Sequence, residues 1–137
     1  MNPLLKYILS LPCIFLHCLL LIAYCPLLYS QPTKKSEEQL KKQAKEHFEN
    51  KAYSEALLLY SQLLSLYPKD PNYSYRFGAC KLFAEKDKEQ PLIYLEYSAN
   101  ATNVEPEAYF YLGKAYHLNY RFNEALTQYR FFKEKGN

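Results

Sequence analysis

Small residues recur along the chain at a nearly fixed interval, and this interval limits the folds that the sequence can adopt. One series, with intervals of 34 and 35 residues, consists of Ala44, Gly78 and Gly113. A second series, with intervals of 35 and 34 residues, consists of Ala56, Pro91 and Ala125. A period of about 34 residues is typical of repeats that each contain two helices. Small residues let the helix backbones approach each other, so the period predicts three stacked helical hairpins.

Apolar residues at helical spacing surround each small residue, and polar or proline-containing breaks separate six expected helices. We expect helices over residues 36–50, 54–67, 73–85 and 90–99, followed by a third hairpin that begins at Pro106. Ser36 is the expected N-cap of the first helix, because acidic residues follow it. The domain prediction is a leader over 1–30, a linker over 31–36 and a repeat domain over 37–137. Within that domain the repeats cover about 37–70, 71–105 and 106–137.

The leader, Met1–Ser30, differs in composition from the rest of the chain. It holds one charge, Lys6, before an apolar run over residues 7–24, and it ends on a small residue. These are the parts of a secretory signal peptide, with cleavage expected after Ser30. Two alternatives remain: a membrane anchor over residues 7–24, which is close to the ~17–25 residues that span a bilayer, and a lipid-modified Cys25. All three place the remaining chain outside the cytoplasm.

Charge and cysteine content narrow the class of function. The formal net charge is +3, and the leader contributes only Lys6, which leaves +2 on the remaining residues. This balance argues against a nucleic-acid partner or an anionic membrane surface. Three of the four cysteines lie in the leader, so Cys80 has no partner for an intramolecular disulfide if the leader is removed. We expect Cys80 to fill a small buried space.

No pattern in the sequence indicates catalysis. The three glycines, Gly78, Gly113 and Gly136, stand alone, so no phosphate-binding loop is present. His47 and His117 are seventy positions apart, and neither has metal-ligand spacing to other residues. We therefore predict no enzymatic activity, no cofactor, no metal site and no small-molecule substrate.

The three hairpins resemble the tetratricopeptide repeat family. The best match is PEAYFYLGKAYHLNYRFNEALTQYRFFKE, from Pro106 to Glu134. The first repeat departs at Gln43 and His47, and the second has Pro91 where the family has alanine. The resemblance implies an all-α fold in which three hairpins stack as a short right-handed α-solenoid, preceded by a signal peptide or hydrophobic helix.

A narrower resemblance concerns PNYSYRFGACKLFAEKDKEQPLIYLEYSA and EAYFYLGKAYHLNYRFNEAL. These stretches are similar to the N-terminal repeat module of a group of Bacteroidetes envelope proteins. Those relatives often continue into a β-propeller and an outer-membrane-protein-A-like domain, which this sequence does not include. The resemblance implies a location in the periplasm or on the periplasmic face of the outer membrane. Anchoring in the inner membrane by residues 7–24 is the alternative.

The tetratricopeptide resemblance also implies a partner-binding groove, formed by the first helix of each hairpin. The groove positions carried over from the family are Lys41, Lys45, Tyr75, Ala79, Leu82, Phe110, Lys114 and His117. Such a set suits an acidic or C-terminal peptide segment, or an envelope protein, through charge and aromatic contact. The alternative is that the lysines of the first repeat only solvate a helix face, while the aromatic residues pack between hairpins.

The end of the third repeat is the second expected binding surface. Repeat arrays usually close with a polar capping element, whereas only five residues follow Phe132 in this sequence. We expect Leu126, Tyr129 and Phe132 to leave apolar surface that docks on a partner or on a second copy. The predicted function is a non-enzymatic protein-binding scaffold in the bacterial envelope. The alternative is a structural subunit, or a truncated N-terminal module, of an assembly of the outer membrane or peptidoglycan, similar to type IX secretion or gliding machinery.

Overall fold

The structure is a computed structural model that describes residues 34–136. These residues form six helices and no strand, which confirms the predicted all-helical fold for this part of the chain. The helices are α2 (Lys34–Glu49), α3 (Tyr53–Leu66), α4 (Pro71–Ala84), α5 (Pro91–Ala99), α6 (Glu107–Leu118) and α7 (Phe122–Lys135). Internal contacts divide the chain into Met1–Lys34 and Lys35–Asn137. The predicted leader and its cysteines lie outside the described residues.

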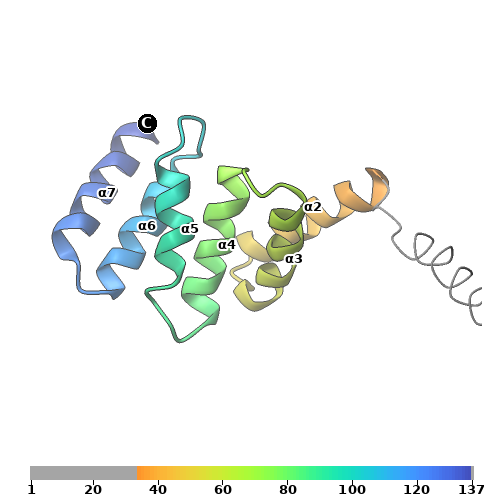
Figure 1. The fold of residues 1–137 in the computed structure, drawn as a ribbon, viewed down its shortest axis with the longest axis horizontal. Coiled ribbons are helices and arrows are strands. Elements are labelled where there is room, and N and C mark those ends of the chain that lie inside the picture. The colour runs from red at the N-terminus through yellow and green to blue at the C-terminus, as the bar shows by residue number, and fades with distance from the viewer. Residues whose placement is uncertain (1–33, 137) are drawn as a thin grey trace, which may run out of the picture. The chain divides into compact units, whose positions relative to one another are not determined.

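The helices are packed in chain order, in a repeat-like arrangement. Each helix from α3 to α7 packs against the next, and these helices lie side by side in Figure 1. A shared apolar cluster joins α2, α3 and α4 through Ala44, Tyr60 and Cys80. The buried Cys80 therefore fills space in the core, as predicted. Because α4 also packs against α6, the first helices of the second and third hairpins are direct neighbours.

The recurring small residues lie where two helices approach each other closely. A Cβ atom added to Gly113 would lie 2.6 Å from the Tyr129 ring and 3.2 Å from the backbone oxygen of Ala125. At Gly78 it would lie 3.0 Å from Leu95. The sequence prediction that these positions must be small is confirmed, because larger residues would collide with the second helix of the same hairpin.

The turns of the first and third hairpins have the same backbone conformation. Lys51 and Tyr120, which are 69 positions apart, both have a φ of 60°. The N–H of Lys51 donates to Phe48 O at 3.0 Å, and that of Tyr120 donates to His117 O at 3.1 Å. In each turn the backbone N–H of the next residue donates to the carbonyl oxygen of the residue five positions earlier, and the N···O distance is 2.9 Å in both turns. The repeat therefore extends from the helices to the turns that connect them.

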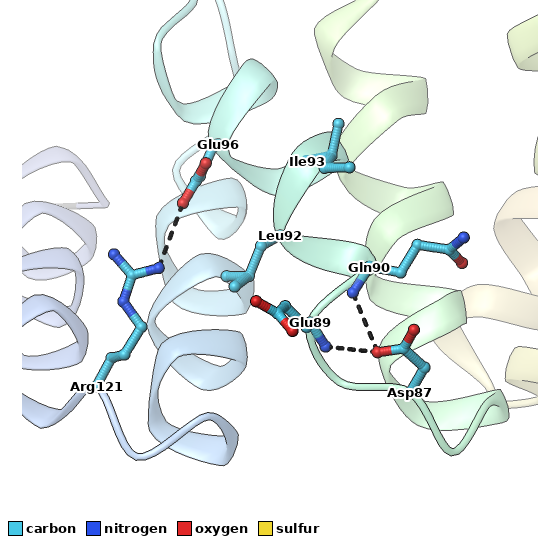
Figure 2. A pocket seen from close by; sticks show the side chains of 7 residues that line it. All are labelled: Asp87, Glu89, Gln90, Leu92, Ile93, Glu96 and Arg121. Atoms are coloured by element: carbon cyan, nitrogen blue, oxygen red, sulfur yellow. Dashed lines mark hydrogen bonds and ion pairs between the residues drawn. The ribbon is translucent and has the colours of Figure 1, made fainter.

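Aspartate side chains accept backbone hydrogen bonds in the first turn of α4 and in the turn that precedes α5. The Asp70 carboxylate accepts backbone N–H bonds of 2.8 and 3.0 Å from the first turn of α4, and Pro71 is its first residue. The Asp87 carboxylate accepts two such bonds, of 2.9 and 3.2 Å, just before Pro91 begins α5 (Figure 2). Proline is tolerated at this position because its missing N–H has no partner there. The prediction for α2 was wrong: its helix already includes Lys34, so Ser36 is not the N-cap.

Aromatic rings connect all three hairpins. The ring of Phe48, at the end of α2, makes edge contacts with the rings of Tyr60, Tyr75 and Tyr111, at centroid distances of 5.8, 6.5 and 5.5 Å. Tyr111 lies on α6, so the first hairpin touches the third directly. Tyr111 also contacts the ring of Phe110 at 5.3 Å. Each of these ring pairs contributes about 0.5–1.5 kcal/mol to the free energy of folding beyond the burial of apolar area.

Candidate functional site

A cleft of about 320 Å³ lies on the side of the molecule where the first helices of the hairpins meet. Its lining comes from α2, α4 and the segment that leads into α6, and consists of Lys45, Phe48, Glu49, Tyr75, Arg76, Glu105 and Glu107. Two cations face three carboxylates, so the lining has a net charge of −1. This cleft therefore does not have the three-lysine lining that was predicted for the groove.

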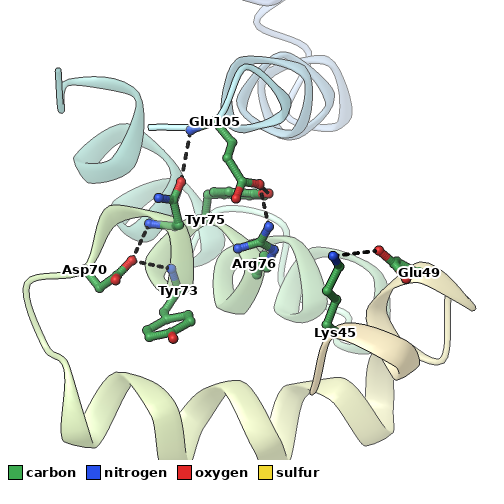
Figure 3. A network of polar contacts seen from close by, with 8 residues as sticks. Lys45, Glu49, Asp70, Tyr73, Tyr75, Arg76 and Glu105 are labelled. Carbon is green, nitrogen blue, oxygen red and sulfur yellow. Dashed lines mark hydrogen bonds and ion pairs between the residues drawn. The ribbon is translucent and has the colours of Figure 1, made fainter. Parts of the chain in front are cut away.

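A hydrogen-bonded network closes one side of this cleft and connects α4 with the start of the third hairpin (Figure 3). The Glu105 carboxylate accepts hydrogen bonds from the Arg76 guanidinium and from the Tyr75 hydroxyl, the latter at 2.5 Å. The Glu105 N–H donates to the Asn72 side-chain oxygen at 2.9 Å. Burial opposes ionisation of Glu105, but the bonds from Arg76 and Tyr75 outweigh it and lower the pKa of Glu105. The network therefore ties the segment before α6 to α4 through the side chains of Tyr75 and Arg76.

Three of the predicted groove residues are part of the core. Tyr75 is 1% exposed, and Ala79 and Leu82 are completely buried. The physical reason is that α4 lies between α2 and α6, so that Phe48 and Tyr111 cover its outward side. Tyr75 is the one residue of these three that also lines the cleft. The expectation that these three side chains form an accessible groove is corrected accordingly.

The predicted groove lysines lie in different surroundings. The Lys41 ammonium is 2.5 Å from a Glu37 carboxylate oxygen, and this hydrogen bond raises the pKa of Lys41. Lys45 lines the cleft and lies 3.7 Å from Glu49, with most of its side chain exposed. Lys114 is partly buried on α6 and does not line the cleft. One of the three lysines, Lys45, is therefore available to a ligand in the cleft.

Phe110 and His117, the remaining predicted groove positions, belong to the third hairpin. The Phe110 ring packs against the rings of Tyr129 and Phe132, at 6.1 and 5.5 Å. His117 is exposed, and its ring lies 5.5 Å from that of Phe122 at the α6–α7 turn. Neither residue lines the cleft.

The outer side of α7 is the second surface that the sequence indicated. Leu126 is 50% exposed, while Tyr129 and Phe132 are partly buried because they pack on Phe110. Phe122, which the sequence prediction omitted, is 56% exposed. Phe122, Leu126, Arg130 and Lys133 follow at intervals of four, four and three residues, which places them along one side of the helix. We call these four exposed residues the α7 stripe.

Sequence reasoning did not identify Arg76 or Glu105 as cleft residues. Arg76 adjoins Tyr75 in the predicted helix, but Glu105 lies in a loop whose position no helical period could give. Among residues 34–136, no cluster of His, Cys, Asp and Glu side chains has an arrangement suited to a metal ion. A search of the same residues for a helix of the length and apolarity needed to cross a bilayer found none.

The fold and these surfaces define the class as an all-helical, repeat-like protein. The comparisons with known proteins go no further: no family model matches the chain, and no curated protein matches it.

Proposed function

We propose that the chain is a non-enzymatic scaffold that binds another protein, built from three tetratricopeptide-type hairpins in a short right-handed solenoid. The regular spacing of small residues, and the repeated turn at Lys51 and Tyr120, support this classification. The proposed location is the bacterial envelope, on the periplasmic side, after export by the leader. N-terminal sequencing of the exported chain tests this location, and a mature N-terminus at Gln31 is the expected result.

The observation that carries the proposed function is the α7 stripe. Phe122 and Leu126, one turn apart, are both at least half exposed, and two cations follow them on the same side of the helix. Exposed apolar residues bordered by charge are typical of protein-binding surfaces. A partner segment with apolar side chains and carboxylates would complement the stripe. The acidic partner inferred from the sequence therefore fits α7 better than it fits the cleft.

The cleft has a different part in this proposal. Its net charge of −1 and its internally paired Arg76 give no preference for an acidic ligand. We infer that the cleft network holds the second and third hairpins together, so that α7 is presented on a rigid support. Lys45 contributes at most a peripheral contact with the partner, because it is exposed and already lies near Glu49.

Photo-crosslinking in cells that produce the protein tests the proposal. A benzophenone amino acid is placed at Leu126 or, as a matched control, at Leu58, which lies on α3 and is 67% exposed. We expect a discrete crosslinked protein from position 126 only, and we expect the double variant Arg130→Glu/Lys133→Glu to lose it. Equal crosslinking from position 58, or an unchanged product after charge reversal, would contradict the proposal. A crosslink to one fixed component of the outer membrane or peptidoglycan would favour the alternative of a structural subunit.

A further inference from the structure

A second binding surface lies around Ile93 on α5, away from the α7 stripe. Ile93 is 68% exposed, although isoleucine is among the residues most often buried in folded proteins. It lines two separate clefts. An exposed β-branched residue that lines two clefts is a suitable contact point for a partner side chain.

The first of these clefts is apolar and has a volume of about 240 Å³. Its lining contains no charged residue and consists of Leu64, Pro68, Ser74, Ile93, Tyr94 and Tyr97. Two of its three hydroxyl groups are already bonded: the Ser74 hydroxyl donates to Tyr94 O at 3.1 Å, and the Tyr97 hydroxyl donates to Lys69 O at 3.1 Å. Its volume is below the roughly 300–1,000 Å³ of most small-molecule sites. The cleft therefore suits one large apolar side chain rather than a polar metabolite.

The second cleft, of about 470 Å³, is acidic (Figure 2). Three carboxylates, those of Asp87, Glu89 and Glu96, face one guanidinium, that of Arg121, which gives its lining a net charge of −2. Arg121 lies 3.9 Å from Glu96 and 3.0 Å from Glu124, so its charge is shared between two carboxylates. The Glu89 carboxylate forms no ion pair with any other residue in the described range.

No lysine lines this cleft. The Lys88 ammonium donates to the backbone oxygens of Leu82 and Glu85, the former at 2.6 Å, which directs it away from the lining. Lys86 lies in the same turn but does not line the cleft. Glu89 lies four residues before Ile93, in the turn that leads into α5, and Glu96 lies three residues after it, on the helix. The Glu96 carboxylate also accepts a hydrogen bond of 2.7 Å from the Tyr116 hydroxyl, so Glu89 carries the charge that has no partner in the described range.

We propose that the Ile93 surface binds a cationic protein segment, which inserts a large apolar side chain beside Tyr94 and Tyr97 and directs a Lys or Arg to Glu89 and Glu96. Charge complementarity selects this occupant, because an acidic segment would be repelled by the second cleft. The α7 stripe has the opposite preference, so the chain would join an acidic partner to a basic one. The proposal for the Ile93 surface does not depend on the proposal that the α7 stripe binds an acidic partner.

Fluorescence anisotropy on the full-length chain tests this proposal with three labelled amphipathic peptides. One peptide has Leu on one face and Lys on the other, a second has Leu and Glu, and a third has Ser and Lys. We expect the Leu–Lys peptide to bind most tightly at the Ile93 surface, with an affinity that falls as salt is added. Ile93→Ser should weaken this binding about tenfold, and Glu89→Gln about two- to fivefold.

Matched controls separate this surface from the α7 stripe. Leu58→Ser removes an apolar side chain of equal exposure, and Glu55→Gln removes an exposed carboxylate; neither position lines either cleft. Leu126→Ser should weaken the binding of the Leu–Glu peptide and leave the binding of the Leu–Lys peptide unchanged. The proposal would be overturned if Ile93→Ser and Leu58→Ser weakened the binding of the Leu–Lys peptide equally. It would also be overturned if the Ser–Lys peptide bound as tightly as the Leu–Lys peptide. Sedimentation that shows a dimer abolished by Ile93→Ser would overturn it as well, because the occupant would then be a second copy.

Discussion

Replacement of Gly113 by alanine tests the packing of the third hairpin most directly. The added methyl group would lie 2.6 and 2.7 Å from two atoms of the Tyr129 ring and 3.2 Å from the backbone oxygen of Ala125. Overpacking of this kind costs about 1–3 kcal/mol. Alanine is the better helix former by about 1 kcal/mol, which offsets part of that cost. Because one of the close contacts is with backbone, we expect a net loss of about 1–2 kcal/mol.

Denaturation of the full-length chain, followed by circular dichroism at 222 nm, measures this loss. A change of 1 kcal/mol corresponds to a shift in Tm of roughly 4–8 °C for a domain of this size. A double-mutant cycle with Tyr129→Ala separates the collision from other effects. Without the ring, only the 3.2 Å contact with the backbone oxygen of Ala125 remains, so Gly113→Ala should cost clearly less than in the unmodified chain, because the gain in helix propensity of about 1 kcal/mol offsets more of the cost. The reasoning is refuted if Gly113→Ala stabilises the unmodified chain, or if its cost is the same in the Tyr129→Ala background.

Two further predictions concern the cleft network and the turns. At pH 7, Glu105→Gln should destabilise the fold by about 1–2 kcal/mol, because Arg76 and the Tyr75 hydroxyl lose an ionised acceptor. The pKa of Glu105 is lowered in the folded chain, so its contribution is present above the unfolded pKa of about 4.3 and is lost as pH falls through the folded value. Urea titrations should therefore show the stabilities of the two chains converging as pH falls below about 4.3, and a constant difference would contradict this assignment. Tyr120→Gly should raise Tm, because a φ of 60° costs a non-glycine residue about 1 kcal/mol and the side chain is 82% exposed. Lys51→Gly, at the equivalent turn, should change Tm in the same direction, and opposite signs would show that the two turns are not equivalent.

The sequence predicted those parts of the fold that depend on local pattern. The spacing of Gly78 and Gly113 located the close helix contacts, and Pro91 was correctly expected in the first turn of its helix. These predictions succeed because a missing side chain or a missing N–H has the same effect in any helix of this type. The burial of Cys80 followed from its apolar neighbours in the same way.

The sequence did not predict how the hairpins close around α4. Whether Tyr75 faces solvent depends on Phe48 and Tyr111, which lie on the helices on either side of it. The period of apolar residues in one helix identifies its apolar side. It does not show whether helices that are not adjacent in the chain, such as α2 and α6, also cover that helix. For the same reason Glu105, in a loop without a period, could not be assigned to Arg76.

The contact between Phe48 and Tyr111 determines how the helical array can come apart. In a linear stack where each repeat touches only its neighbours, a terminal repeat can open while the remainder stays folded. Here, separation of α2 would remove the Phe48 ring from α3, α4 and α6 together. Opening of the first hairpin would therefore also remove a ring contact of the third, which raises the free-energy cost of that opening by about 0.5–1.5 kcal/mol. We infer that the first hairpin opens less independently than the terminal repeat of a linear stack does.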